Sequence, residues 1–160
     1  MLLFLRIILL VCLPLSASAE PIFFPANNGD QHAPILKIYS SLDEPIAEPI
    51  VEGFQKQHPD IAVSYEDMLT GEIYDRIVRE TDAGDYTADF ALSSAMDLQV
   101  KLSNDGYAQR VNLAMSESWP QWANWRNTAY ALTFEPAVFV YHKPSFLNQP
   151  PPSSRAELVD

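Results

Sequence analysis

Hydroxyl side chains occupy three turns of the chain, each directly after a short apolar run. Ser40 and Ser41 form the first group, Thr70 stands in the second turn, and Ser93 and Ser94 form the third. Hydroxyl groups and the free backbone N–H groups at a helix start can together hold a small anion. The residue types therefore predict a ligand-binding site without metal or cofactor, provided that the fold brings the three turns together.

The same residue types also cap helices, and this use is the competing interpretation. A serine before a helix most often accepts a hydrogen bond from a backbone N–H group. The sequence Ser94-Ala95-Met96-Asp97 fits the capping box, in which the serine and the acid satisfy backbone N–H groups reciprocally. For Ser94 alone we expect a cap. For the paired serines, capping and ligand contact both stay open.

The turns belong to a regular alternation of strands and helices. Short apolar runs predict three strands, over residues 35–39, 61–65 and 88–92. Apolar residues spaced by three and four predict three helices, over 47–54, from a Thr70 cap to Gly84, and from Ser94 to Gly106. This order favours an α/β layer structure with parallel strands and right-handed crossovers. Ligands of such folds bind at the carboxyl edge of the strands, where all three turns would lie.

Two prolines bear on the start of the first helix. Pro45 suits a first helical turn. Pro49 would remove one intrahelical hydrogen bond, so we expect a kink or a later start there.

The pattern changes after Val111. Trp119, Trp122 and Trp125 are spaced by three, which indicates either an aromatic wall packed on the sheet or a site that stacks on a sugar or a cation. Residues 129–134 and 137–141 form two extended runs. Pro150-Pro151-Pro152 then precedes residues 153–158, which resemble the opening of another helix.

Residues 1–19 have the pattern of a secretory signal peptide. Arg6 lies near the start, an apolar run spans 7–15, and the small residues 17–19 precede Glu20. The alternative, a membrane anchor, would need about 20 uninterrupted apolar residues. We therefore expect cleavage after residue 19 and a periplasmic location, with no membrane embedding afterwards. Residues 20–34 read as an extended arm.

Composition excludes several functions. Apolar residues make up 48% and charged residues 19%, as in a folded protein, and the net charge of −11 argues against nucleic-acid partners. Cys12, the one cysteine, lies in the leader, so the mature chain has no disulfide or thiolate metal site. The sequence has no nucleophile elbow and no His-x-x-x-His motif, so we expect neither an enzyme nor a metal site. Neighbouring acids such as Glu66 and Asp67 are more typical of a solvated surface.

Residues 36–147 resemble the extracytoplasmic solute-binding proteins of bacterial ABC importers, in the class similar to ferric-iron-binding proteins. The matching segments are LKIYSSLDEPIAEPIVEGFQKQHPDIAVSYED, TGEIYDRIVRE, ADFALSSAMDLQVKLSNDGYAQRV and ALTFEPAVFVYHKPSF. The resemblance implies a periplasmic-binding-protein type II-like lobe over 35–149, with a mainly parallel sheet flanked by helices. Family members are about twice as long, so residues 150–160 would begin a second lobe before which this chain is truncated.

The resemblance also implies a ligand and partners. Iron-binding members place a His and a Glu in the first and third turns, where this chain has Asp43 and Ser94, and their tyrosine pair would lie beyond Asp160. A phosphonate, phosphate ester or carboxylate is therefore expected in preference to ferric ion. The expected partner is an ABC permease. The alternative is a sensory or adaptor protein that presents the solute to a membrane-bound histidine kinase.

Overall fold

A four-stranded sheet forms the centre of the molecule. The computed structural model describes residues 20–113, 118–136, 138–148 and 150–158. The sheet has the order β1-β3-β2-β4 and consists of β1 (Ile22–Phe24), β2 (Ile35–Ser40), β3 (Ala62–Asp67) and β4 (Phe90–Leu92). Strand β2 pairs in parallel with both β3 and β4, whereas β1 is antiparallel to β3. The mainly parallel α/β sheet expected from the sequence is therefore confirmed.

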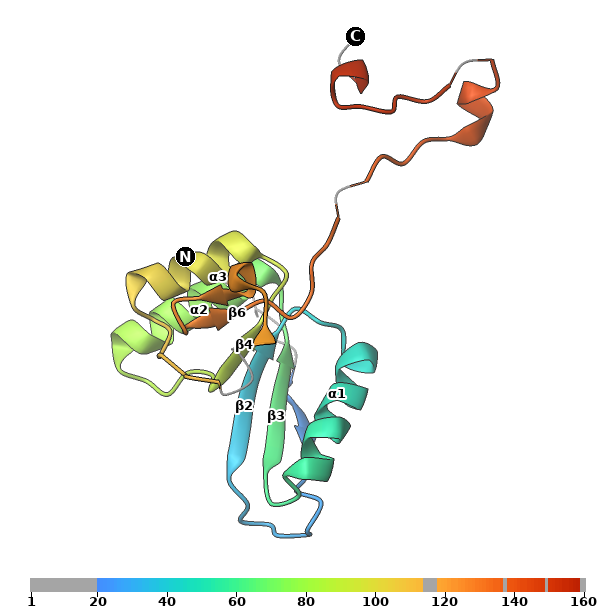
Figure 1. Ribbon diagram of the computed structural model, residues 1–160. Coiled ribbons are helices and arrows are strands. Elements are labelled where there is room, and N and C mark those ends of the chain that lie inside the picture. Colours follow the sequence, from blue (N-terminus) through green and yellow to red (C-terminus); the bar gives the residue numbers. More distant parts are fainter. Residues whose placement is uncertain (1–19, 114–117, 137, 149, 159–160) are drawn as a thin grey trace, which may run out of the picture.

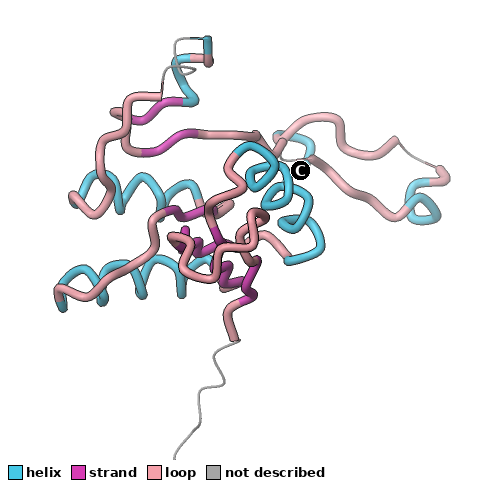
Figure 2. Tube along the Cα trace, turned by 90° about the horizontal axis from the view of Figure 1, so that it is seen from below, coloured by secondary structure: helices cyan, strands magenta, loops and turns pink. Residues whose placement is uncertain are grey.

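Helices cover both faces of the sheet, as Figures 1 and 2 show. Helix α1 (Glu44–Gln57) lies on one face, and α2 (Thr70–Ala83) and α3 (Met96–Asp105) lie on the other. Two apolar clusters join these layers, one on each side of the sheet: Ala47, Val51, Val63 and Tyr65 beneath α1, and Tyr39, Ile73, Ile77 and Leu102 beneath α2 and α3. Val63 and Tyr65, two positions apart on β3, thus face the same cluster, as the period of a strand requires.

Helix α1 begins earlier than the prolines suggested. The carbonyl of Asp43 accepts hydrogen bonds from the N–H groups of Ile46 and Ala47, so the first turn is already formed before Pro49. Pro49 lies inside the helix, and the expectation of a later start is wrong. The helix continues through the proline because Ala47 and Val51 bury their side chains against the sheet, which offsets one missing backbone hydrogen bond.

Strand β1 lies within the segment that the sequence predicted only as an extended arm. Its residues pair Ile22 with Tyr65 and Phe24 with Val63. The buried amide of Gln55 donates hydrogen bonds to the carbonyls of Pro25 (2.9 Å) and Ile61 (3.0 Å), which fastens the arm to α1 and to the start of β3. The predicted leader, residues 1–19, lies outside the described residues.

The region after Val111 forms less regular structure than expected. Only Ala129–Tyr130 (β6) of the run 129–134 is a strand, and it makes a small hairpin with Asn124–Trp125 (β5). Residues 138–141 form no strand, and Ala137 lies outside the described residues. Residues 156–158 form one short 3-10 turn where the sequence predicted a helix opening, and further 3-10 turns span Gln121–Ala123 and Lys143–Phe146. Trp119 packs edge-on against Tyr130 (5.8 Å between ring centres), whereas Trp122 is exposed.

A buried ionic cluster fixes α2 on the sheet. Arg76 of α2 donates hydrogen bonds to Glu66 at the end of β3 and to Glu80 one turn along the helix (Nε to Oε1, 2.8 Å). Glu80 also accepts a hydrogen bond from the hydroxyl of Tyr39 (2.8 Å), and the Arg76 guanidinium lies 4.5 Å from the centre of the Tyr39 ring. Because Glu66 and Tyr39 are nearly inaccessible to solvent, the cluster replaces the water that these groups lose on folding.

The pKa shifts in this cluster follow from the same contacts. Burial and the hydrogen bond to Glu80 raise the pKa of Tyr39. Burial alone would raise the pKa of Glu80, but the hydrogen bonds from Arg76 and Tyr39 outweigh it, and the pKa of Glu80 is lowered. A carboxyl whose pKa is lowered by folding stabilises the folded state while it is ionised, and this contribution disappears as the pH falls through the lowered pKa.

We predict that Glu80→Gln lowers the free energy of unfolding by about 2 kcal/mol at pH 7, because the variant loses the charge that pairs with Arg76. The difference from the parent chain should shrink as the pH falls below the ordinary carboxyl value of 4.5. Urea unfolding of both chains at pH 7 and at pH 3.5 measures this difference in the free energy of unfolding. The exposed Glu48→Gln serves as the control and should change little at either pH. A difference that stays constant between the two pH values would contradict this account.

Candidate functional site

The turns after β2, β3 and β4 come together at the carboxyl edge of the sheet, as the parallel order predicts. The N–H of Ser41 donates to the carbonyl of Leu92 (3.0 Å), and the N–H of Ser94 approaches the Ser41 hydroxyl oxygen at 3.4 Å. The N–H of Met68 donates to the carbonyl of Ser40 (2.8 Å). Backbone and side-chain hydrogen bonds thus link the first turn to both of the others.

Ser40 was predicted to contact a ligand, but its side chain points into the protein. Its residue is fully buried, and its hydroxyl oxygen accepts the N–H of Leu42 at 3.0 Å. This burial favours a structural role for Ser40 in shaping the turn over contact with a ligand.

Helix α3 does not begin with the capping box that the sequence predicted for Ser94. Helix α3 begins at Met96, its cap position is Ala95, and no side chain caps it. The hydroxyl oxygen of Ser93 instead accepts the N–H of Ala95 (3.2 Å), and the carbonyl of Ser94 accepts the N–H of Met96. The predicted Ser94 cap is therefore wrong by one residue. Ser94 is exposed, and its hydroxyl makes no hydrogen bond within the part of the chain that the structure describes.

Thr70 follows β3 by three residues and is the first residue of α2 rather than its cap. Leu69 holds the cap position, and its N–H donates to the carboxylate of Glu72 (3.2 Å). Thr70 is half-buried, and no hydrogen bond among the described residues ties its hydroxyl to the serines. The structure thus brings Ser41 and Ser94 into contact, whereas no hydrogen bond joins Thr70 to either of them among the described residues.

Tyr65 contacts the first turn at this edge, and it was not among the predicted site residues. It is buried, and its hydroxyl donates a hydrogen bond to the carbonyl of Leu42 in the first turn. Burial raises the pKa of the Tyr65 hydroxyl, so the group stays a proton donor at neutral pH. The only sequence signal for it was its place in the apolar run 61–65, because its partner lies 23 residues away.

The helices that begin at this edge carry acidic side chains in their first turns. The first turns of the three helices carry Glu44, Glu72 and Asp97. These carboxylates already interact favourably with the helix dipoles, which reduces the pull of the helix starts on a further anion. Recognition at this edge therefore rests on hydrogen bonds from hydroxyl and backbone N–H groups rather than on net positive charge.

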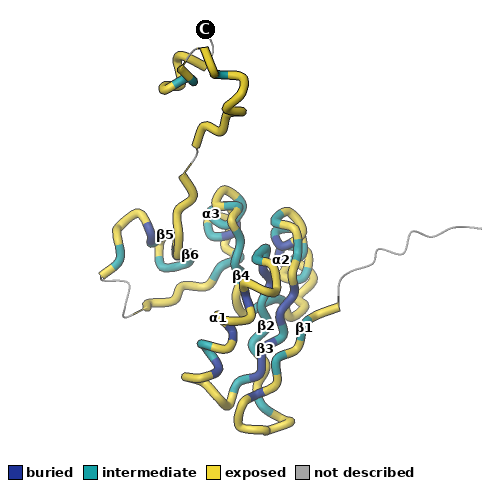
Figure 3. The backbone as a smooth tube through the Cα atoms, turned by 90° about the vertical axis from the view of Figure 1, so that its right-hand side faces the viewer, coloured by how far each residue is buried: buried dark blue, intermediate teal, exposed yellow. Residues whose placement is uncertain are grey.

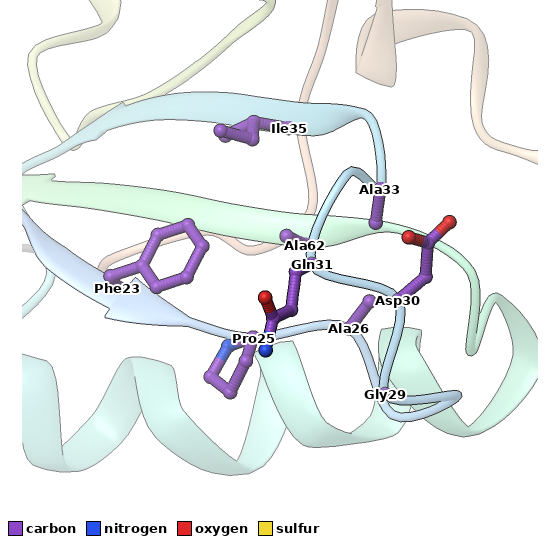
Figure 4. Close-up of a pocket in the computed structure, with 9 residues that line it drawn as sticks. All are labelled: Phe23, Pro25, Ala26, Gly29, Asp30, Gln31, Ala33, Ile35 and Ala62. Atoms are coloured by element: carbon purple, nitrogen blue, oxygen red, sulfur yellow. The ribbon is translucent and has the colours of Figure 1, made fainter.

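A separate hollow lies at the opposite end of the sheet. Its volume is about 380 Å³, and Figure 4 shows its lining: Phe23, Pro25, Ala26, Gly29, Asp30, Gln31, Ala33, Ile35 and Ala62. Ile35 and Ala62 are the first residues of β2 and β3, so this hollow faces away from the serine turns. None of the predicted ligand-binding residues lines it.

The described residues contain no group of three or more His, Cys, Asp or Glu side chains that could hold a metal ion. Within the same residues, no helix is long and apolar enough to cross a membrane.

We predict that Ser93→Ala lowers the free energy of unfolding by about 1 kcal/mol, because the variant loses the hydrogen bond that orders the start of α3. Ser94→Ala should leave stability nearly unchanged, since the Ser94 hydroxyl supports no turn. Thermal unfolding of both variants measures the difference. The original capping-box interpretation requires the reverse order of effects.

Comparison with known proteins places the chain in a family. A model of the bacterial extracellular solute-binding proteins matches residues 33–158. The crystal structure of a substrate-binding protein of an ABC transporter from Agrobacterium tumefaciens is 74% identical, with a TM-score of 0.75. The match covers 88% of this chain and 41% of that protein, so the chain spans less than half the length of this relative. No curated protein matches at a significant level. Because the family model covers most of the chain, the protein belongs to the bacterial extracellular solute-binding proteins.

Proposed function

We propose that this chain contributes the solute-binding lobe of an ABC-type importer, and that its serine edge holds a small anionic solute such as a phosphonate, a phosphate ester or a carboxylate. The observation that carries the proposal is the contact between Ser41 and Ser94, which joins two strand-end turns at the start of α3. The role is binding and delivery to a membrane permease, not catalysis.

The donors available at this edge suit an oxygen-rich anion. The hydroxyls of Ser41 and Ser94 can rotate to donate toward a common point. The N–H groups of Asp97 and Leu98 in the first turn of α3 find no backbone acceptor among the described residues, which leaves them as further donors. A phosphonate or carboxylate presents two or three acceptor oxygens and can satisfy several of these donors at once.

The acidic first turns set the expected strength of binding. Because Asp97 lies beside the proposed donors, the site offers no net positive charge to a dianion. We therefore expect this lobe alone to bind its anion weakly, with dissociation constants in the millimolar range, since it lacks contacts from an opposing lobe. Micromolar binding of any of the probe ions by this chain alone would contradict that expectation.

We predict that methylphosphonate, inorganic phosphate and acetate shift the amide NMR signals of Ser41, Ser94 and Asp97 in the chain starting at Glu20. The double variant Ser41→Ala with Ser94→Ala should lose at least three quarters of the shift, because both hydroxyl donors are removed. Thr81→Ala is the matched control, since it removes an exposed hydroxyl at the far end of α2. Equal shifts with glucose, or unchanged shifts in the double variant, would refute the anion site.

We predict that the exported protein begins at Glu20 and is found in the periplasm. Cleavage after residue 19 leaves two residues before β1, so the pairing of Ile22 with Tyr65 survives processing. Amino-terminal sequencing of the protein from a periplasmic extract measures this. A mature chain that starts inside or after β1, or one that keeps residue 1, would contradict it.

A further inference from the structure

The hollow at the end of the sheet opposite the serine turns lies on a face that the helices leave uncovered. Tyr39 lies beneath α2 and α3, so Ile35, four positions earlier on β2, shares that face. Ile22 and Phe24 pack against the cluster beneath α1, so Phe23 between them points to the same face as Ile35. Ile35 is nevertheless 53% exposed and Phe23 56%. Neither α2 nor α3 therefore covers these two side chains, and Figure 4 shows both lining the hollow.

The loop between β1 and β2 closes the other side of the hollow, and hydrogen bonds fix its course. Figure 3 shows this mostly exposed loop below the sheet. The N–H of Asn28 donates to the carbonyl of Pro59 (2.9 Å), and the N–H of Gly29 donates to the carbonyl of Ala26 (3.1 Å). Gly29 has a φ of 78°, which residues with a side chain rarely adopt. Ala26 and Ala62 are buried lining residues, so the hollow has a packed floor.

The loop also supplies two polar side chains whose acceptor atoms are free. Oδ1 of Asp30 accepts the N–H of His32 (2.9 Å), but among the described residues no group donates to Oδ2 of Asp30 or to the side-chain oxygen of Gln31. Figure 4 shows Asp30 at the end of the hollow opposite Phe23, with Gln31 between them. None of the nine lining residues is Lys or Arg. The hollow thus combines an apolar wall with a negative charge that no cation in its lining neutralises.

We propose that this hollow binds a small molecule that carries a primary ammonium group on an apolar body. The ammonium group has three N–H donors, and these meet the free Oδ2 of Asp30 and the amide oxygen of Gln31. The apolar body packs on Phe23, Ile35 and Ala62. A volume of about 380 Å³ suits a molecule of the size of an aralkylamine. The proposed amine site is separate from the serine edge and does not depend on which solute that edge binds.

The test uses phenethylamine hydrochloride at pH 7 and the chain that starts at Glu20. We expect a saturable shift in the amide NMR signals of Phe23, Asp30 and Ala62. Phenethyl alcohol has the same apolar body without the charge, so it should bind about tenfold more weakly than the amine. Equal affinity for the amine and the alcohol, or shifts that do not saturate, would overturn the proposal. Amine-induced shifts confined to Ser41 and Ser94 would overturn it too, and they would leave the anion titration of the serine edge as a separate result.

Variants of two residues separate the charge from the apolar wall. Asp30→Asn keeps the oxygen that accepts the N–H of His32, so the loop should fold, but it should weaken binding of the amine about tenfold and leave the alcohol unchanged. Asp75→Asn is the matched control, since it removes an exposed carboxylate on α2 that does not line the hollow. Phe23→Thr keeps a strand-forming residue and should weaken both ligands. An unchanged affinity for the amine in Asp30→Asn, or an equal loss in Asp75→Asn, would contradict the amine site.

Discussion

A carboxylate buried in a sheet must be paired, and the pairing of Glu66 with Arg76 is the constraint on which this lobe depends. Glu66 lies beside Tyr39 in the register of β3 and β2, and Arg76 reaches both from α2. Removing one member would leave an uncompensated charge in a dry environment, which costs far more than an exposed ion pair contributes. The cluster therefore sets where α2 sits on the sheet, in addition to stabilising it.

The position of α2 in turn shapes the carboxyl edge. The turn between β3 and α2 is short, and the N–H of Met68 within it donates to the carbonyl of Ser40. Ser40 is then held inward, and the next residue, Ser41, is the one that meets Ser94. The arrangement of hydroxyls at the edge is thus linked, through the turn between β3 and α2, to elements that the Glu66–Arg76 ion pair holds together.

The elements that could be predicted from the sequence are those whose signals lie within a single segment. The strands β2 and β3 and the ends of α2 and α3 were predictable, because apolar runs and the glycines 84 and 106, both with positive φ, are signals within one element. Strand β1 was not, since it is three residues long and depends on pairing with β3 and on the amide of Gln55 about 30 residues away. The Arg76 cluster could not be predicted for the same reason, because it joins residues of different elements. Only the spacing of four between Arg76 and Glu80 along α2 indicated a contact. The choice between Ser93 and Ser94 as the ordering hydroxyl depends on which side chain faces the turn, and residue type cannot decide it.

The serine edge is open to solvent, and this limits how tightly it can hold an anion. Ser41, Ser94 and the first turn of α3 offer donors from one side only, so water keeps access to the bound anion and weakens each hydrogen bond. A polypeptide that closed over the strand ends would exclude this water and strengthen the hydrogen bonds to the anion. Binding of the proposed anion and such a closure would therefore be thermodynamically coupled, each favouring the other by the same factor.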